Sequence, residues 1–300
     1  SFAAALASPL HAALVVPMNS STLTSDLYCV MGNPVAHSRS PAIHARFAEL
    51  TGQHLRYERR LIALDGFARG VRDFIAKGGR GCNITVPFKF EAPALASVCS
   101  ERVRLAGAAN VLSFAADGSI HADNTDGLGL VADITRNAGV PLQGARLLLV
   151  GAGGAAAGVL GPLLQAGVRH ITIANRTVAK AEALVASHSA LAALQKAELL
   201  ALAPQALEGD FDVIINATAS SLAGDAVPVP ASVLRPGSLA YDMMYGPAAQ
   251  GFLDWAQAHG AVARDGLGML VEQAAEAFAI WRGVRPPSAQ VLEELRHAPH

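Results

Sequence analysis

The sequence predicts an α/β protein of two domains, and three observations support this prediction. From Asp26 onward, short apolar runs alternate with longer segments of helical pattern, as in folds whose sheets are covered by helices. Runs such as 146–150 (RLLLV) are apolar almost throughout, which is typical of parallel strands that are buried on both faces. The chain has 300 residues, about the length at which single cores stop growing and chains divide into domains.

The first unit of the chain is expected to run from the first strand, over 26–31, to about Asp126. A helix follows this strand, with Ser40 as its N-cap and Pro41 as its first residue, the positions where these residue types are favoured. Further strands are expected over 55–61, 83–86, 110–114 and 119–121, and further helices over 67–76 and 94–105.

The second unit is more regular. A helical pattern over 127–139 leads into it, and two helices are expected near the end of the chain, after a break at Gly266 and Gly268. Its strands are predicted over 146–150, 170–174, 212–215 and 239–242, its helices over 155–166 and 178–187, and the final helices over 269–281 and 288–296.

The composition argues against nucleic acid and membranes as partners. There are 23 Lys and Arg residues against 24 Asp and Glu, and no basic block that could neutralise a phosphate backbone. The mean hydropathy is +0.33, but the apolar stretches break well before the ~20 residues that a spanning helix needs. Residues 1–17 lack the basic start of a signal peptide, so we expect 1–22 to be an N-terminal extension, with Met18 as a candidate start.

The cysteines favour a reducing compartment. Cys29, Cys82 and Cys99 cannot all pair and show no C-x-x-C spacing. We therefore expect reduced thiols and a cytoplasmic protein. No cluster of His, Cys and acidic residues has the spacing of metal ligands, so no metal is expected.

A glycine turn marks the start of the second unit. The run 147–150 is followed by Gly151, Ala152, Gly153, Gly154, Ala155 and Ala156, which is the strand, turn and helix of a dinucleotide-binding unit. Gly151 allows the tight turn, Gly153 lets a pyrophosphate approach the backbone, and Ala156 lets the helix pack closely on the sheet. The alternative is a glycine turn with no ligand.

The residues after the next strand select the cofactor. About 24 residues beyond Gly151 stand Asn175, Arg176 and Thr177, with Lys180 a turn further on and no acid at this point. An acid there would bind a ribose 2′-hydroxyl, whereas Arg176 and Lys180 favour a 2′-phosphate. We therefore predict NADP(H); the alternative is that both side chains are ordinary solvated charges.

Three polar clusters follow strand ends in the first unit. Residues 32–41 (GNPVAHSRSP) place two hydroxyls before a helix, a natural cradle for a carboxylate. Residues 83–89 (NITVPFK) carry an amide, a hydroxyl and an amine, and residues 122–127 (ADNTDG) carry a carboxylate. Taken singly, each cluster has a structural reading: a helix cap, a strand edge and the N-cap of the next helix.

Taken together and in this order, the clusters resemble the shikimate dehydrogenase family. The resemblance extends from about Leu27 to Leu292. The segments that carry it are 32–41, 83–89, 107–110 (GAAN), 124–127 (NTDG), 151–154, 175–177 (NRT), 216–218 (NAT), 241–245 (YDMMY) and 265–270 (DGLGML). The chain departs from the family at Ala122, Val111 and Ser220-Ser221, none of which is a proton-transfer or carboxylate-binding group.

The resemblance implies a domain division and a role for each site residue. Residues 23–126 and 264–297 are expected to form the substrate-binding domain, and 127–263 a Rossmann-type NADP-binding domain. Lys89 and Asp126 correspond to the family's catalytic pair. The implied substrate-binding residues are Ser38, Ser40, Asn83, Thr85, Asn110, Tyr245 and Gln273, with Asp126 also at the ring hydroxyls; the cofactor-binding residues are Gly151, Ala152, Gly153, Gly154, Ala155, Asn175, Arg176, Thr177, Lys180, Thr218, Gly266 and Met269.

The implied activity is the reversible NADPH-dependent reduction of 3-dehydroshikimate to shikimate, the step toward chorismate and aromatic amino acids. Such a reaction needs a hydride and a proton, and Lys89 is the best proton donor in the clusters. Alternatives are a quinate or dual quinate/shikimate dehydrogenase and a ligand sensor without catalysis, although Lys89 and Asp126 are both retained. The partner is then a small molecule, and the protein a monomer or homodimer.

Overall fold

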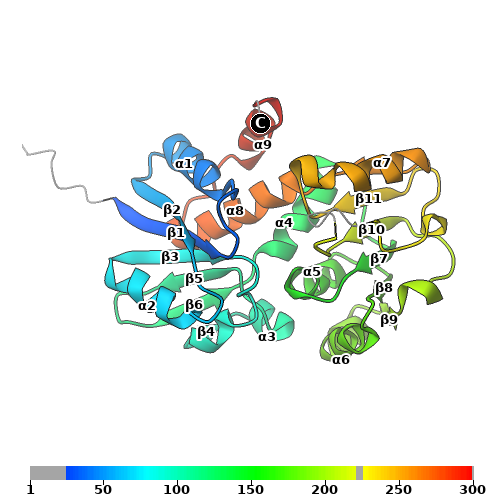
Figure 1. The fold of residues 1–300 in the computed structure, drawn as a ribbon, viewed down its shortest axis with the longest axis horizontal. Helices are drawn as coiled ribbons and strands as arrows, with labels where there is room; N and C mark the ends of the chain where they lie inside the picture. The colour runs from blue at the N-terminus through cyan, green and yellow to red at the C-terminus, as the bar shows by residue number, and fades with distance from the viewer. Residues whose placement is uncertain (1–24, 221–225, 299–300) are drawn as a thin grey trace, which may run out of the picture.

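Two six-stranded sheets lie on opposite sides of the molecule, with helices around and between them (Figure 1). The computed structural model describes residues 25–220 and 226–298; the expected extension over 1–22 lies outside the described residues. The first sheet has the strand order β2-β1-β3-β5-β6-β4 and the second β12-β11-β10-β7-β8-β9. The predicted α/β fold is confirmed.

The first sheet is mixed. Strand β1 pairs in parallel with β2 and β3, and β4 with β6, whereas β5 runs antiparallel to β3 and β6. Its strands are β1 Asp26–Gly32, β2 Leu55–Leu61, β3 Gly79–Ile84, β4 Val98–Cys99, β5 Val111–Phe114 and β6 Ile120–Asp123.

The second sheet is parallel in every pair. The apolar runs explain this arrangement, because strands covered by helices on both faces have no polar face to present to water. Its strands are β7 Arg146–Val150, β8 His170–Ala174, β9 Glu198–Leu202, β10 Val213–Asn216, β11 Leu239–Asp242 and β12 Val262–Arg264.

Two helices, α4 and α8, run between the sheets (Figure 1). They pack against each other at glycines, since a Cβ on Gly129 of α4 would stand 2.7 Å from the backbone nitrogen of Gln273 on α8. The C-terminal helices return to the first unit: Val271 and Phe278 of α8 share a core with Phe47 of α1. The α-helices are α1 Ser40–Thr51, α2 Phe67–Ala76, α3 Glu101–Ala106, α4 Asp126–Ala132, α5 Gly154–Gln165, α6 Val178–Leu194, α7 Gln250–Ala258, α8 Leu267–Arg282 and α9 Ser288–His297.

The helices predicted over 94–105 and 127–139 are not single α-helices in the structure. The helix expected over 94–105 is three pieces: a 3-10 turn Ala92–Leu95, strand β4, and α3. The Ser100 hydroxyl accepts a hydrogen bond from the Val103 N–H at 3.2 Å, so Ser100 is the N-cap and α3 begins at Glu101. The helix expected over 127–139 is α4 followed by a π-helical turn, Asp133–Asn137.

The predicted N-cap of the first helix was also wrong. Helix α1 begins at Ser40 itself, and its N-cap is Arg39, whose side chain makes no capping hydrogen bond. Strand β3 covers residues 79–84 rather than 83–86, because the chain turns at Thr85, whose N–H still bonds to the Met31 carbonyl at 2.9 Å.

Strands β9 and β12 and helix α7 of the second unit were not predicted. Strand β9 follows an Ala- and Leu-rich segment that belongs to α6, and these residue types favour helix. The strand begins only after Lys196, which has φ of 56°. Helix α6 therefore extends to Leu194, beyond the predicted end at residue 187.

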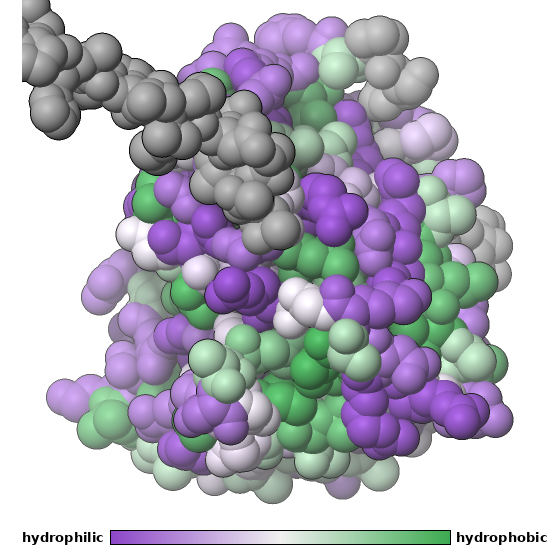
Figure 2. All heavy atoms as spheres, turned by 90° about the vertical axis from the view of Figure 1, so that its left-hand side faces the viewer, coloured by the Kyte–Doolittle hydropathy of each residue, from purple (hydrophilic) through white to green (hydrophobic). Residues whose placement is uncertain are grey.

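The surface on the side of the first sheet mixes hydrophilic and hydrophobic side chains (Figure 2). Among residues 25–220 and 226–298, no helix is both long and apolar enough to cross a bilayer.

Candidate active site

A lysine–aspartate ion pair lies at the centre of the candidate site. The Lys89 Nζ is 2.6 Å from Asp126 Oδ2, and only 15% and 7% of these two side chains are exposed. Lys89 follows the turn after β3, where its carbonyl accepts a hydrogen bond from Ala109 at 2.9 Å. Asp126 is the first residue of α4. Strong shielding from water makes this pair tighter than a surface ion pair.

An amide network holds the other oxygen of Asp126. The Asn110 Nδ2 donates to Asp126 Oδ1 at 2.9 Å, and it lies 3.4 Å from the side-chain oxygen of Gln273. Thr125 completes the network: its N–H donates to Asn110 Oδ1 at 2.8 Å, and its hydroxyl donates to the Gln273 carbonyl at 3.1 Å. Asn110, Thr125 and Asp126 are all buried, so the carboxylate is held in one orientation.

Asn83 joins this network to a tyrosine that the sequence analysis missed. The Asn83 Nδ2 donates to the Asn110 carbonyl at 3.3 Å, and its Oδ1 accepts from the Tyr57 hydroxyl at 2.6 Å. Burial raises the pKa of Tyr57 well above its usual value, and the nearby Ser40 side chain acts in the opposite direction. The aromatic residue among the four charged residues of strand 55–61 (LRYERRL) was the signal that could have found Tyr57.

The serine turn and Tyr245 come together at the same end of the site. Ser38 Oγ accepts from the Ser40 N–H at 3.3 Å, and the Ser38 carbonyl accepts from Arg59 Nε at 3.1 Å. Burial raises the pKa of Tyr245, while the charges of Arg39 and Arg59 act in the opposite direction. The Arg59 guanidinium thus lies at the serine turn, and the charges of Arg39 and Arg59 both reach Tyr245, which makes this end of the site a suitable place for a carboxylate.

The glycine turn lies directly beside Lys89. Gly151 has φ of 113°, a conformation that L side chains rarely adopt, and a Cβ on it would stand 3.1 Å from the Thr218 methyl. A Cβ on Gly153 would meet nothing within 4 Å, whereas one on Gly154 would stand 3.4 Å from the Lys89 Cβ. The open side of Gly153, at the N-terminus of α5, fits a pyrophosphate group. The buried Ala156 packs α5 on the sheet as predicted.

The segment after β8 continues from this turn. The Gly151 N–H bonds to the Ala174 carbonyl at 2.8 Å, so the turn and the residues 175–177 lie at the same edge of the sheet. Asn175 Nδ2 donates to the Thr177 carbonyl at 2.9 Å. Arg176 and Lys180 are exposed, and neither forms an ion pair within the described part of the chain. Their place fits a phosphate on the far end of a dinucleotide and is separate from the Lys89–Asp126 pair.

Gly266 and Met269 lie where α8 begins. A Cβ on Gly266 would stand 2.2 Å from the Met243 carbonyl oxygen, and the Gly266 N–H bonds to the Met244 carbonyl at 2.9 Å. Met269 is buried and lies one turn before Gln273 on α8. The same helix therefore connects these two positions to the Asp126 network.

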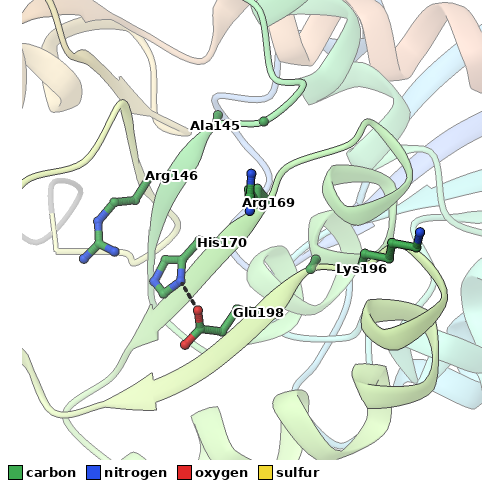
Figure 3. A pocket seen from close by; sticks show the side chains of 8 residues that line it. Ala145, Arg146, Arg169, His170, Lys196 and Glu198 are labelled. Atoms are coloured by element: carbon green, nitrogen blue, oxygen red, sulfur yellow. Dashed lines mark hydrogen bonds and ion pairs between the residues drawn. The ribbon is translucent and has the colours of Figure 1, made fainter.

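A pocket of about 550 Å³ lies elsewhere, at the amino ends of β7, β8 and β9 (Figure 3). Arg146, Arg169 and Lys196 line it but point away from one another, and His170 is paired with Glu198 at 3.3 Å. Ligands of parallel sheets bind outside the carboxyl ends of the strands, where the glycine turn lies. Within the described residues, no group of three or more His, Cys, Asp or Glu could hold a metal ion.

A parallel sheet with a glycine turn, placed beside a lysine–aspartate pair, defines a dinucleotide-binding α/β protein. Family models match most of the described chain: the shikimate dehydrogenase substrate binding domain over 30–112, shikimate / quinate 5-dehydrogenase over 133–223, and the shikimate 5′-dehydrogenase C-terminal domain over 266–296. The chain belongs to the shikimate dehydrogenase family.

Individual relatives agree with this assignment. The shikimate dehydrogenase (NADP(+)) of Verminephrobacter eiseniae is 78% identical over 92% of this chain and 96% of its own length. Among solved structures, an Ael1 enzyme from Pseudomonas putida is 48% identical, with a TM-score of 0.82 over 90% of this chain and 98% of that chain. The shikimate 5-dehydrogenase of Thermus thermophilus, in complex with NADP(H) and shikimate, is 31% identical, with a TM-score of 0.78 over 91% and 100%.

Proposed function

We propose that the chain catalyses the reversible, NADPH-dependent reduction of 3-dehydroshikimate to shikimate. The observation that carries the proposal is the approach of the glycine turn to Lys89, where a Cβ on Gly154 would stand 3.4 Å from the Lys89 Cβ. A proton donor thus lies beside a turn that fits a dinucleotide. The names of relatives at 78% and 76% identity support both the substrate and the cofactor.

The two catalytic residues divide the acid–base work. NADPH, when bound, supplies the hydride that adds to the carbonyl carbon. Lys89 Nζ donates the proton that the carbonyl oxygen needs, and Asp126 Oδ2, at 2.6 Å, keeps the ammonium group in place. In the reverse direction the pair takes the hydroxyl proton. Asn110 holds Asp126 Oδ1, so the carboxylate cannot rotate away from Lys89.

The remaining polar residues bind the substrate. Ser38 and Ser40 bind its carboxylate, supported by the nearby charges of Arg39 and Arg59. The ring hydroxyls are held by amide and hydroxyl groups around Asp126, and Tyr245 lines the same pocket. The proposed hydroxyl-binding residues are Asn83, Thr85, Asn110, Asp126 and Gln273.

Residues at the carboxyl edge of the second sheet would hold the cofactor. The residues 151–155 bind its pyrophosphate, and Asn175, Arg176, Thr177 and Lys180 bind the adenosine end with its 2′-phosphate. Thr218, Gly266 and Met269 would hold the nicotinamide end. The guanidinium of Arg176, which is exposed and has no ion-pair partner among the described residues, supports the choice of NADP(H) over NAD(H).

We further propose the unit boundaries, compartment and assembly. Residues 23–126 and 264–297 form the substrate-binding domain and 127–263 the NADP-binding domain. The free thiols of Cys29, Cys82 and Cys99 support a reducing compartment such as the cytoplasm. The protein acts as a monomer or homodimer on a small-molecule substrate, without nucleic acid or a membrane as partner.

One spectrophotometric assay tests the activity by crossing shikimate and quinate with NADP and NAD. We expect the largest kcat/KM with shikimate and NADP. Higher kcat/KM with quinate would identify a quinate or dual-specificity enzyme. No turnover in all four combinations, with measurable shikimate binding, would favour a ligand sensor and overturn the proposal.

A further inference from the structure

A buried aspartate joins the helix that carries Asp126 to the edge of the second sheet. Asp133 is fully buried. Arg264 on β12 donates to it twice, from Nε to Oδ2 at 3.0 Å and from Nη2 to Oδ1 at 2.8 Å. The hydroxyl of Tyr241 donates to Oδ2 at 2.7 Å, and Asn137 Nδ2 donates to Oδ1 at 2.9 Å. Each oxygen of the Asp133 carboxylate thus accepts two hydrogen bonds.

These groups come together because of the strand register. Tyr241 and Arg264 are direct partners in the parallel pairing of β11 and β12, so their side chains point to the same face of the sheet. Burial by itself would raise the pKa of Asp133, but the hydrogen bonds from Arg264, Tyr241 and Asn137 outweigh it and lower the pKa below its usual value. Asp133 is therefore ionised, and the pair with Arg264 is a buried ion pair.

The ion pair also touches the first turn of α8. A Cβ on Gly268 would stand 1.8 Å from Asp133 Oδ1, so the carboxylate lies directly against the Gly268 backbone. Burial raises the pKa of Tyr241, and the nearby backbone of Met269 acts in the opposite direction. Gly266 stands between Arg264 and these residues. The cluster of Asp133, Tyr241 and Arg264 thus fixes the chain on both sides of Gly266.

We propose that Asp133 is a positioning residue for the nicotinamide end of the cofactor. With Arg264 and Tyr241, it holds residues 265–269 in the conformation that receives this end, while the adenosine end binds elsewhere on the sheet. The inference rests on the proposed function, because that assigns Gly266 and Met269 to the nicotinamide. It predicts that damage to the cluster weakens binding of one part of the cofactor only.

Direct binding of two ligands tests this inference without any turnover. NADPH carries the nicotinamide, whereas 2′-phospho-ADP-ribose has the same adenosine, phosphates and second ribose but lacks it. Asp133→Asn should raise the Kd of NADPH about tenfold, as expected when charged hydrogen bonds are lost, and leave the Kd of 2′-phospho-ADP-ribose within about twofold. Tyr241→Phe, which keeps the ion pair, should raise the Kd of NADPH about threefold.

The matched control is Asp26→Asn. It breaks the ion pair between Asp26 and Arg282, which fastens the opposite end of α8 to β1. This variant should lower the Tm and leave the Kd of both ligands unchanged. If Asp133→Asn does not fold, Tyr241→Phe tests the inference in its place. Tyr241→Phe keeps the ion pair between Asp133 and Arg264, so no buried charge loses its partner.

The outcomes separate the two proposals. If the ratio of the two Kd values is the same in wild type, Asp133→Asn and Tyr241→Phe, Asp133 does not position the nicotinamide end, and the inference is overturned. If wild type binds both ligands but fails to oxidise shikimate, the proposed function is wrong. The ratio of the two Kd values in the variants then still tests the role of Asp133. A wild-type chain that binds neither ligand would overturn both.

Discussion

The two halves of the candidate active site are built in different ways. Around Lys89 and Asp126, buried side chains hold one another through hydrogen bonds of 2.6–3.4 Å. Around Gly153 and Arg176, the site consists of a backbone turn and exposed side chains. A reacting proton needs a fixed donor, whereas a long charged cofactor needs an open surface with backbone N–H groups and mobile cations. The side chains proposed for proton transfer are thus fixed by hydrogen bonds, whereas the side chains proposed to bind the cofactor are exposed.

The largest expected effect is on the buried half. Lys89→Met should lower kcat by about a thousandfold, or about 4 kcal/mol of barrier, because the carbonyl oxygen of the substrate loses its proton donor. The Kd of shikimate should change little. The measurement is steady-state kinetics together with equilibrium binding of shikimate.

Lys77→Met is the control for this change, since Lys77 is an exposed lysine at the end of α2 and its loss should leave kcat unchanged. A kcat of Lys89→Met within about tenfold of wild type would remove Lys89 from the acid–base role.

The next effect is on the exposed half. Arg176→Asp should raise the KM for NADPH about a hundredfold, or about 2.7 kcal/mol, because it replaces a phosphate-binding cation by an anion. The KM for NADH should change far less, and kcat at saturating NADPH should stay near wild type. Arg169→Asp, at the other end of the same strand, is the control and should leave both KM values unchanged. An unaltered KM for NADPH in Arg176→Asp would exclude the proposed phosphate contact.

A third prediction concerns the support beneath the buried half. His44 stacks on Tyr57 with ring centroids 4.4 Å apart, and burial lowers its pKa to about 3. Between pH 6.5 and pH 3 the unfolded chain therefore binds a proton that the folded chain does not. The free energy of unfolding should fall as the pH falls through this range, by about 2 kcal/mol from this residue between about pH 7 and pH 5.

His44→Phe should remove this part of the pH dependence, measured by urea unfolding at about pH 7 and pH 5. The exposed His54 provides the control, because His54→Phe should retain the wild-type loss of stability. An identical acid-induced loss in wild type and His44→Phe would show that His44 becomes protonated without unfolding.

The smallest expected effect is on the glycine turn, where a substitution should change cofactor binding without changing the stability of the fold. A Cβ on Gly153 meets no atom within 4 Å, so Gly153→Ala should leave the Tm unchanged while raising the KM for NADPH about fivefold, or about 1 kcal/mol. Gly251→Ala, which also has free space around it, should leave the KM unchanged. A lower Tm of Gly153→Ala with an unchanged KM for NADPH would contradict the proposal that Gly153 binds the pyrophosphate.

The parts of the fold that could be predicted from sequence were those with strong local patterns. The apolar runs over 146–150, 170–174 and 239–242 predicted β7, β8 and β11 with the bounds that the structure shows. Strand β9 could not be predicted, because its Leu- and Ala-rich residues favour helix and only pairing with β8 makes them a strand.

The site shows the same division. Sequence motifs identified Lys89 and Asp126 as candidate catalytic residues, and the fold places Lys89 Nζ 2.6 Å from Asp126 Oδ2. Tyr57 and Asp133 were missed, because each matters through partners far away in the sequence: Asn83 for Tyr57 and Arg264 for Asp133. Periodicity within one strand or helix carries no information about such distant partners.

The length of α4 has a consequence for how this chain can change during evolution. Asp126 opens the helix and Asp133 follows directly after its seven residues, so the two carboxylates lie on nearly the same side, about 20° apart around the axis. Inserting or deleting one residue between them would rotate one carboxylate by about 100° relative to the other. Only one of the two ion pairs, Asp126 with Lys89 or Asp133 with Arg264, would then keep its geometry. The number of residues between Asp126 and Asp133 should therefore stay fixed as long as both ion pairs are kept.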